Sequence, residues 1–271
     1  MTSLPPGIGV AADPGRRSHM EDRWAVLAMP QGLFAAVYDG HGGHRVADRV
    51  AAELHSAVAH ALQSGLDPSD AFRRGFAELE ALTADEDCGS TVAALLLTGP
   101  RMTTAHVGDS RIVRVGTTRA NGLTRDHRIE APEERARVLR MGAQLDPPYV
   151  LRGNRGLMMT RSLGDRWFRP VGVIGEPEVA HHDVGPDDLA LVAATDGVWD
   201  VLGLEDAARL VRASATAPAA ARTLVDAALA AGTRDNVTAV VVRLADLPPD
   251  DAAGLGSPPA GQASPRRLYS S

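Results

Sequence analysis

Lysine is missing from this chain of 271 residues, and arginine supplies all 28 of its basic side chains. The absence excludes a phosphate-binding loop of the G-x-x-x-x-G-K type, the strand lysine of a kinase and a lysine that holds a cofactor as a Schiff base. The formal net charge of −6 argues against nucleic acid as the main partner, because nucleic-acid surfaces need clustered positive charge. Any recognition of phosphate therefore depends on side chains other than lysine.

Cysteine and long apolar segments are equally scarce. Cys88 is the one cysteine, so the chain cannot form an internal disulfide. The longest apolar candidate, residues 88–100, is shorter than the ~20 residues that a membrane-spanning helix needs, and it contains Ser90 and Thr91. The N-terminal residues lack the basic and apolar regions of a signal peptide. From these absences we expect a cytoplasmic protein that does not associate with membranes.

The composition supports one folded domain. Hydrophobic residues make up 44% of the chain, which is ample for one sizeable core. We expect this domain over residues 13–244, preceded by a flexible lead-in at residues 1–12. Residues 142–176 contain many glycines, prolines and arginines, which predicts an irregular excursion with short strands. Small and polar residues dominate from residue 245, so residues 245–271 are expected to form a disordered tail.

Local patterns predict strand hairpins and helix pairs. Strands are expected near residues 22–29, 33–38, 90–98, 101–107, 111–117, 177–182, 188–195 and 236–244. Helices are expected near residues 43–63, 68–84, 131–141, 204–214 and 218–231. This order favours antiparallel sheets covered by helices over a doubly wound parallel sheet. The expected fold class is therefore a layered α/β sandwich with two packed sheets.

Acidic side chains gather at the ends of these strands. The acids that begin or end a predicted strand are Glu21, Asp22, Asp39, Asp196 and Asp235. Two more stand nearby, since Asp200 follows Asp196 and Asp109 lies in the turn before residues 111–117, which we interpret as the tip of a hairpin. Because strand ends lie on the rim of a sheet, several of these carboxylates can converge.

A two-residue turn at Pro30 and Gln31 would bring two of these acids together. With that turn, the hairpin register places Asp22 opposite Asp39. Antiparallel pairing of the later strands would bring Asp196 and Asp235 to one edge in the same way. A single Asp-Gly pair is more often an ordinary turn than a site, but the number of strand-end acids favours a shared site.

Converging carboxylates repel each other and lose solvation unless protons or metal ions compensate them. An all-oxygen set of ligands suits Mg²⁺ or Mn²⁺, whereas Zn²⁺ would need histidine or cysteine. Two such ions about 3.5–4 Å apart can share a water and convert it to hydroxide near neutral pH. Such a site is best matched to phosphate esters. Arg17 is the candidate for holding the phosphate, and His41 is the candidate for protonating the leaving oxygen.

A series of short motifs runs along the chain in a fixed order. The motifs are RSHMED at residues 17–22, VYDGHGG at 37–43, CGST at 88–91, HVGDSR at 106–111, LTRDH at 123–127, TRSLGD at 160–165, TDGVWD at 195–200 and RDNV at 234–237. Any one of them alone would be weak, whereas the ordered set is specific. With this set, the chain resembles the metal-dependent protein phosphatase 2C family of serine/threonine phosphatases over most of residues 8–244.

The resemblance implies an α-β-β-α sandwich of two mostly antiparallel sheets flanked by helix pairs. Two divalent ions, Mn²⁺ or Mg²⁺, would be bound at one rim between the sheets. Residues 13–244 would then be the catalytic domain, and residues 142–176 would correspond to the family's flap near the catalytic cleft.

The resemblance also implies the role of each site residue. Asp39 would bridge both metal ions. Asp196 and Asp235 would complete one ion's protein ligands, and Glu21 with the Gly40 carbonyl oxygen would hold the other.

The remaining implied roles concern water, substrate and a further ion. Asp22 would orient metal-bound water, Arg17 would bind the substrate phosphate and His41 would be the general acid. A third, weaker metal site of the family is matched by Asp109, Asp200 and Asp196.

The implied reaction is a direct displacement. A metal-bridged hydroxide attacks phosphorus, and the serine or threonine oxygen leaves with a proton from His41. Two other phosphatase mechanisms conflict with the sequence. A C-x5-R cysteine phosphatase needs arginine six positions after Cys88, where Ala94 stands. A haloacid-dehalogenase-type site needs a second acid two residues after Asp39, where His41 stands.

The expected partners are phosphorylated proteins, with the enzyme opposing a serine/threonine kinase, and we expect a monomer. Two alternatives stay open from the sequence. One is a catalytically inactive relative that acts as a scaffold; loss of a metal-binding acid would favour it, and every expected acid is present. The other is a hydrolase of small phosphate esters, which shares the chemistry but not the substrate.

Overall fold

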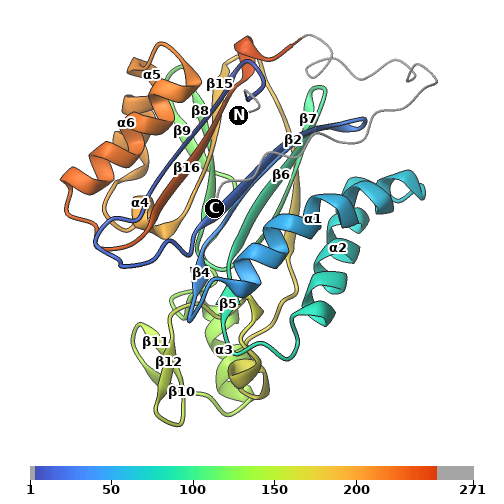
Figure 1. The fold of residues 1–271 in the computed structure, drawn as a ribbon, viewed down its shortest axis with the longest axis vertical. Helices are drawn as coiled ribbons and strands as arrows, with labels where there is room; N and C mark the ends of the chain where they lie inside the picture. Colours follow the sequence, from blue (N-terminus) through green and yellow to red (C-terminus); the bar gives the residue numbers. More distant parts are fainter. Residues whose placement is uncertain (1–3, 249–271) are drawn as a thin grey trace.

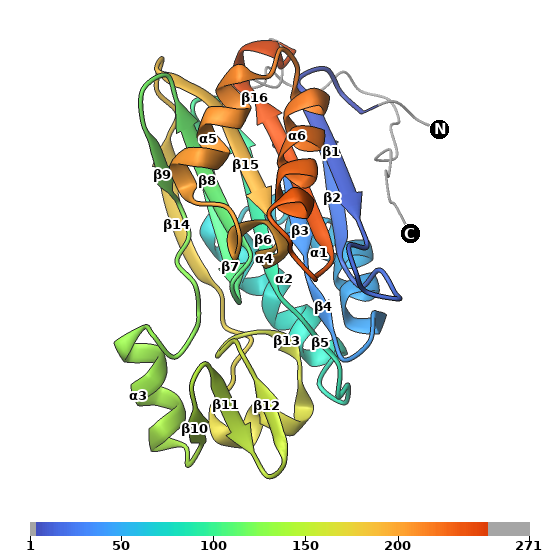
Figure 2. The same ribbon diagram turned by 90° about the vertical axis from the view of Figure 1, so that its left-hand side faces the viewer.

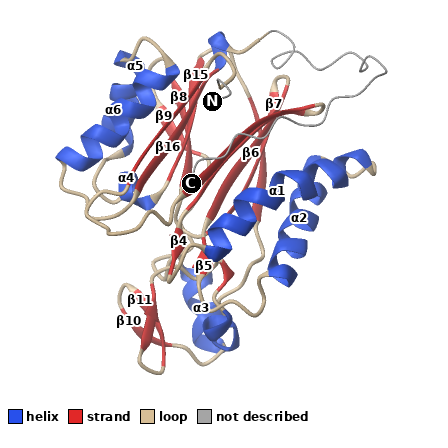
Figure 3. Ribbon diagram, viewed as in Figure 1, coloured by secondary structure: helices blue, strands red, loops and turns tan. Residues whose placement is uncertain are grey.

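The fold has four layers in a computed structural model that describes residues 4–248. Two five-stranded sheets pack face to face, and helices cover the outer face of each (Figures 1 and 2). Figure 3 shows the order of the layers by secondary structure: helices, sheet, sheet, helices. This confirms the expected α-β-β-α sandwich.

Each sheet is built from antiparallel pairs of neighbouring strands. The first sheet has the order β14-β7-β6-β3-β2, with β2 (Arg23–Met29), β3 (Gly32–Tyr38), β6 (Val92–Thr98), β7 (Arg101–Val107) and β14 (Glu178–Asp183). The second has the order β1-β16-β15-β8-β9, with β1 (Ile8–Asp13), β8 (Arg111–Gly116), β9 (Ala120–Gly122), β15 (Asp188–Ala194) and β16 (Val237–Arg243). Most predicted strands are thus found close to their predicted bounds.

The apolar run of β3 is explained by burial on both of its faces. Phe34 and Tyr38 point to the helices that cover the first sheet, whereas Leu33 and Val37 point into the core between the sheets. A central strand of a sandwich covered by helices therefore shows no alternation of polar and apolar residues.

Pairs of helices cover the two outer faces. Helices α1 (Arg45–Gln63) and α2 (Pro68–Leu82) lie on the first sheet, and the second carries α5 (Leu204–Ala213), α6 (Ala217–Ala230) and the short α4 (Asp196–Trp199). Helix α2 is capped at its N-terminus, since the Asp67 side chain accepts the N–H of Asp70 at 3.0 Å. Among residues 4–248, no helix is both long and apolar enough to cross a membrane.

Together with the helix that precedes it, the excursion predicted at residues 142–176 forms an outlying unit at one end of the sandwich (Figure 2). It contains α3 (Pro132–Arg140), β10 (Gln144–Asp146), β11 (Tyr149–Arg152), β12 (Arg155–Leu157) and the 3-10 helix η1 (Arg166–Val171). These elements share a small apolar core that includes Val138, Val150 and Phe168. A short sheet of β4 (Gly40–His41), β5 (Gly89–Ser90) and β13 (Leu163–Gly164) connects the unit to the sandwich.

Glu134 of α3 anchors this excursion. Its carboxylate accepts hydrogen bonds from Arg137, from the Thr160 hydroxyl at 2.5 Å and from Arg161 Nη2 at 2.7 Å. Burial alone would raise the pKa of Glu134, but these hydrogen bonds outweigh burial and hold its pKa well below the usual range.

The flexible lead-in predicted over residues 1–12 is wrong for residues 8–12, which belong to β1. This strand pairs with β16 along its length, from Ile8 with Val242 to Asp13 with Val237. Its small residues gave no strand pattern, and small size is what the packing requires: a Cβ on Gly9 would lie 2.0 Å from the Ala217 carbonyl oxygen of α6. Residues 1–3 lie outside the described part of the chain.

The folded domain also extends slightly beyond its predicted end. Residues Leu244–Asp246 form the 3-10 helix η2, and Leu247, only 8% exposed, packs into the core between the sheets. The predicted disordered tail otherwise falls on residues 249–271, which lie outside the described residues.

The hairpin predicted around Asp109 is a crossover between the sheets. Strand β7 belongs to the first sheet and β8 to the second, so Gly108 to Ser110 carry the chain from one to the other. A turn sequence does not distinguish a hairpin from such a crossing. The consequence is that Asp109 lies between the two sheets.

Candidate metal centre

Carboxylates from both sheets meet at one rim of the sandwich. Asp39 follows β3 of the first sheet, Asp196 lies just after β15 of the second, and Asp109 lies on the crossover. A carboxylate oxygen of each lies within 4.8 Å of an oxygen of the other two. The structure therefore brings together two predicted ligands of the central ions and one acid assigned to a third.

Hydrogen bonds through Thr91 fix Asp39 and the crossover relative to each other. The Asp39 N–H donates to Thr91 Oγ1 at 3.1 Å, and its carbonyl oxygen accepts the Thr91 N–H at 2.9 Å. Thr91 Oγ1 also lies 2.7 Å from Ser110 Oγ. Gly108 is required beside this contact, because it has φ +92° and a Cβ there would lie 2.5 Å from Thr91 Cγ2.

The cluster carries negative charge that its surroundings do not fully compensate. Burial raises the pKa of Asp39 well above its usual range, and the neighbouring carboxylates of Asp196, Asp22 and Asp109 raise it further. Burial, then Asp109, likewise raises the pKa of Asp196. Asp109 Oδ1 and Asp196 Oδ1 are buried without a hydrogen-bond partner among the described residues. Such orphaned oxygens fit Mg²⁺ or Mn²⁺, which prefer oxygen ligands.

Glu21 and Asp22 come just before β2 of the first sheet, and Gly40 follows Asp39 as the first residue of β4. The register of β2 and β3 pairs Arg23 with Tyr38, as the predicted two-residue turn requires, so Asp22 and Asp39 follow as neighbours. The backbones of Glu21 and Gly40 approach so closely that a Cβ on Gly40 would lie 2.7 Å from the Glu21 carbonyl oxygen.

Asp22 is only 3% exposed. Its Oδ2 accepts the Thr195 hydroxyl at 2.8 Å. Burial raises the pKa of Asp22 to about 7, although the nearby Thr238 and Thr195 hydroxyls oppose the rise. Asp22 is thus held beside the second sheet by the Thr195 hydroxyl.

Asp235, just before β16, pairs with Arg17. Arg17 Nη2 donates to Asp235 Oδ2 at 2.7 Å, and the Arg17 side chain is 55% exposed. The adjacent Asn236 joins the two segments, since its Oδ1 accepts the Glu21 N–H at 2.7 Å. Arg17 therefore lies at the solvent side of the acidic cluster.

His41 has a carboxylate partner that the sequence did not reveal. His41 Nε2 lies 2.7 Å from Asp165 Oδ2, and Asp165 also accepts the Ser162 hydroxyl at 2.5 Å. Burial would lower the pKa of His41, but the Asp165 carboxylate outweighs burial and raises it. His41 Nδ1 is buried with no hydrogen-bond partner in the described part of the chain. The only feature of the sequence that could have pointed to Asp165 was its place in the TRSLGD motif.

Arg128 was also missed, and it contacts all three acids predicted for a third metal. Its Nε lies 2.7 Å from Asp109 Oδ2, and its Nη2 lies 3.2 Å from Asp200 Oδ1 and 3.6 Å from Asp196 Oδ2. Burial would lower the pKa of Arg128, but Asp109 and Asp200 outweigh it and raise the pKa further. Only its position directly after the LTRDH motif marked this residue.

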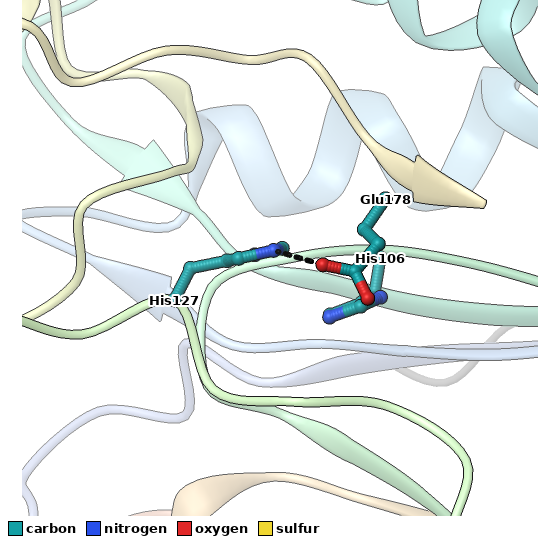
Figure 4. A group of neighbouring side chains, drawn as sticks. All are labelled: His106, His127 and Glu178. Carbon is teal, nitrogen blue, oxygen red and sulfur yellow. Dashed lines mark ion pairs between the residues drawn. The ribbon is translucent and has the colours of Figure 1, made fainter. Parts of the chain in front are cut away.

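A second group of potential ligands lies apart from these acids and consists of His106, His127 and Glu178 (Figure 4). The two imidazole rings stack with centroids 4.4 Å apart. His127 Nδ1 accepts the Gly108 N–H at 3.2 Å, and burial lowers the pKa of His127 to about 2. The neutral ring therefore has its proton on Nε2, which lies 3.5 Å from Glu178 Oε2. A metal ion would have to displace that proton, so the group is better explained as packing.

Known proteins match most of this chain. The family model described as Protein phosphatase 2C matches residues 7–237. The Arabidopsis thaliana protein described as Probable protein phosphatase 2C 59 is 32% identical over 260 residues, which cover 92% of this chain and 82% of that protein.

Solved structures show the same architecture. The structure of a C. elegans sex determining protein superposes with a TM-score of 0.79 at 26% identity, covering 93% of this chain and 67% of that one. A serine-threonine phosphatase 2C from Toxoplasma gondii shares the fold, with a TM-score of 0.75 at 24% identity over 89% of this chain and 96% of that one. Because the family model spans nearly the whole sandwich, the chain belongs to the protein phosphatase 2C family.

Proposed function

We propose that this chain is a metal-dependent phosphatase that hydrolyses phosphoserine and phosphothreonine in proteins. The observation that carries the proposal is the convergence of Asp39, Asp109 and Asp196, with carboxylate oxygens that no described hydrogen-bond donor satisfies. The names of its relatives as protein phosphatases support the class of substrate.

The acids divide into two groups around Asp39. We assign Asp39 to both of two Mn²⁺ or Mg²⁺ ions, Asp196 and Asp235 to one of them, and Glu21 with the Gly40 carbonyl oxygen to the other. When bound, the two ions supply an activated water as nucleophile and neutralise charge on the phosphate.

Two residues then position the reactants. Arg17 is exposed and lies on the rim of the acidic cluster, where its planar guanidinium can hold two phosphate oxygens while Asp235 orients it. The Thr195 hydroxyl fixes Oδ2 of Asp22, so that the carboxylate is held in place to orient the attacking water.

His41 protonates the leaving oxygen of serine or threonine. Asp165 holds Nε2 and favours the doubly protonated ring, so the proton is donated from Nδ1, the nitrogen without a protein partner. The reaction is a single displacement without a phosphoenzyme. Cys88, the one thiol, is buried, which agrees with this mechanism.

The test is hydrolysis of phosphoserine and phosphothreonine peptides with Mn²⁺, with a chelator, and with Asp196→Asn. We expect activity that depends on Mn²⁺ and that falls at least about 10²-fold in the variant, a loss typical of removing transition-state charge stabilisation. The control is Asp187→Asn, which changes an exposed acid in the turn between β14 and β15.

Each contrary result points to a different alternative. Equal rates under all conditions would contradict the metal mechanism, and activity on phosphotyrosine alone would contradict the serine/threonine assignment. Hydrolysis of nitrophenyl phosphate without any phosphopeptide activity would indicate a small-ester hydrolase. Binding of Mn²⁺ without any hydrolysis would indicate an inactive scaffold.

A further inference from the structure

The acids that the family resemblance assigns to a third metal ion surround a guanidinium. Arg128 lies between Asp109, Asp200 and Asp196, at distances of 2.7, 3.2 and 3.6 Å. The fixed positive charge of the guanidinium offsets part of the negative charge of these three carboxylates and occupies the oxygens that face it. A further divalent ion would have to share these oxygens with the guanidinium.

The carboxylate oxygens are divided between Arg128 and the central site. Asp109 and Asp196 both turn Oδ2 toward Arg128. Their Oδ1 atoms are the buried oxygens without a hydrogen-bond partner among residues 4–248. Each acid thus has one oxygen occupied on the Arg128 side and one oxygen available to the centre that contains Asp39.

Arg128 is held in this position by the fold. Its side chain is only 17% exposed, and its backbone forms an antiparallel bridge with Met159. The preceding residue, His127, donates its N–H to the Gly108 carbonyl oxygen at 2.9 Å and accepts the Thr160 N–H at 2.7 Å. The guanidinium therefore cannot leave the acids by a simple movement of an exposed side chain.

We propose that Arg128 is an internal cation that takes the place of a third metal ion, so that the enzyme binds two divalent ions. The residues present do not fit a third ion, because its charge would lie beside a guanidinium whose only carboxylate partners among residues 4–248 are these same three acids. The proposal rests on the two-metal centre proposed above and adds the number of ions and the residue that limits it.

The test is a count of Mn²⁺ ions bound per chain, measured on the metal-free full-length protein by equilibrium dialysis up to low-millimolar Mn²⁺. We expect two ions for the wild type and three for Arg128→Gln, which frees the oxygens of Asp109, Asp196 and Asp200. Arg128→Lys keeps the positive charge and should bind two.

Two further variants separate the charge of Arg128 from a general effect of losing an arginine. Arg125→Gln removes a nearby arginine that is 53% exposed and pairs with Glu133 and Glu178 outside the centre, so it should bind two ions. Adding Asp200→Asn to Arg128→Gln should return the count from three to two.

A wild type that binds three ions would overturn the proposal, and this result does not depend on whether any variant folds. A folded Arg128→Gln protein that still binds two ions would overturn it as well. The count requires no substrate, so it separates this inference from the proposed function. Three ions with phosphatase activity would contradict only the inference, whereas no bound Mn²⁺ would contradict the metal centre itself.

Discussion

Asp39→Asn is expected to stabilise the metal-free protein, although it removes the central residue of the site. Asp39 lies within 4.8 Å of carboxylate oxygens of both Asp109 and Asp196. At that separation, two like charges repel by about 3 kcal/mol when the effective dielectric constant is about 20. Proton sharing within the cluster and the Arg128 guanidinium offset part of this repulsion. We therefore expect the free energy of unfolding to rise by about 1–3 kcal/mol in the variant.

In Mn²⁺, the wild type should become more stable than Asp39→Asn. At about 100 times its dissociation constant, one bound ion raises the free energy of unfolding by about 2.7 kcal/mol, and the Asn variant lacks the bridging ligand needed to gain it. Urea unfolding in chelator and in Mn²⁺ measures both effects, with Asp187→Asn as the control for loss of an exposed acid. An Asp39→Asn protein less stable than wild type in chelator, or equally stabilised by Mn²⁺, would refute the reasoning.

Three further perturbations test other parts of the account. Glu134→Gln should cost about 3 kcal/mol at neutral pH, because it leaves two arginines without their buried carboxylate. Folding lowers the pKa of Glu134, so the stability that this carboxylate contributes is complete above its unfolded pKa and is lost as the pH falls. The difference in urea midpoint between wild type and Glu134→Gln should therefore narrow on acidification, and a widening difference would contradict this. Asp165→Asn should slow hydrolysis of phosphoserine peptides about tenfold more than hydrolysis of nitrophenyl phosphate, because the leaving oxygen of nitrophenyl phosphate needs no proton from His41. Equal losses of rate on the two substrates would count against an acid role for His41 supported by Asp165. Gly108→Ala should lower the free energy of unfolding by about 2–4 kcal/mol, because Gly108 has φ +92° and a Cβ there would meet Thr91. Gly65→Ala should cost only about 1–2 kcal/mol, because Gly65 has φ +93° but open space around it. Equal costs in thermal unfolding would exclude the close contact with Thr91.

The parts of the site that local rules determine could be predicted from the sequence. A two-residue turn fixes the register of a hairpin, so the neighbouring positions of Asp22 and Asp39 followed from residue numbers alone. The ends of β15 and β16 placed Asp196 and Asp235 on one edge for the same reason. In these cases the turn length and the strand ends determine where the acids lie.

The parts that depend on contacts distant in the sequence could not be predicted. Arg128 and Asp165 act through Asp109 and His41, which come from other elements, and no local pattern joins the pairs. The crossover at Asp109 has the sequence of an ordinary turn, and only the packing of two sheets shows that it links them. The family motifs included or adjoined both missed residues but implied no role for either.

The most direct test of the two-metal centre is anomalous scattering from crystals soaked in Mn²⁺. The account predicts two Mn²⁺ peaks that share the Asp39 carboxylate, and none between Arg128 and Asp200 or beside His106 and His127. Absence of any peak at Asp39, or a peak in place of the Arg128 guanidinium, would contradict it.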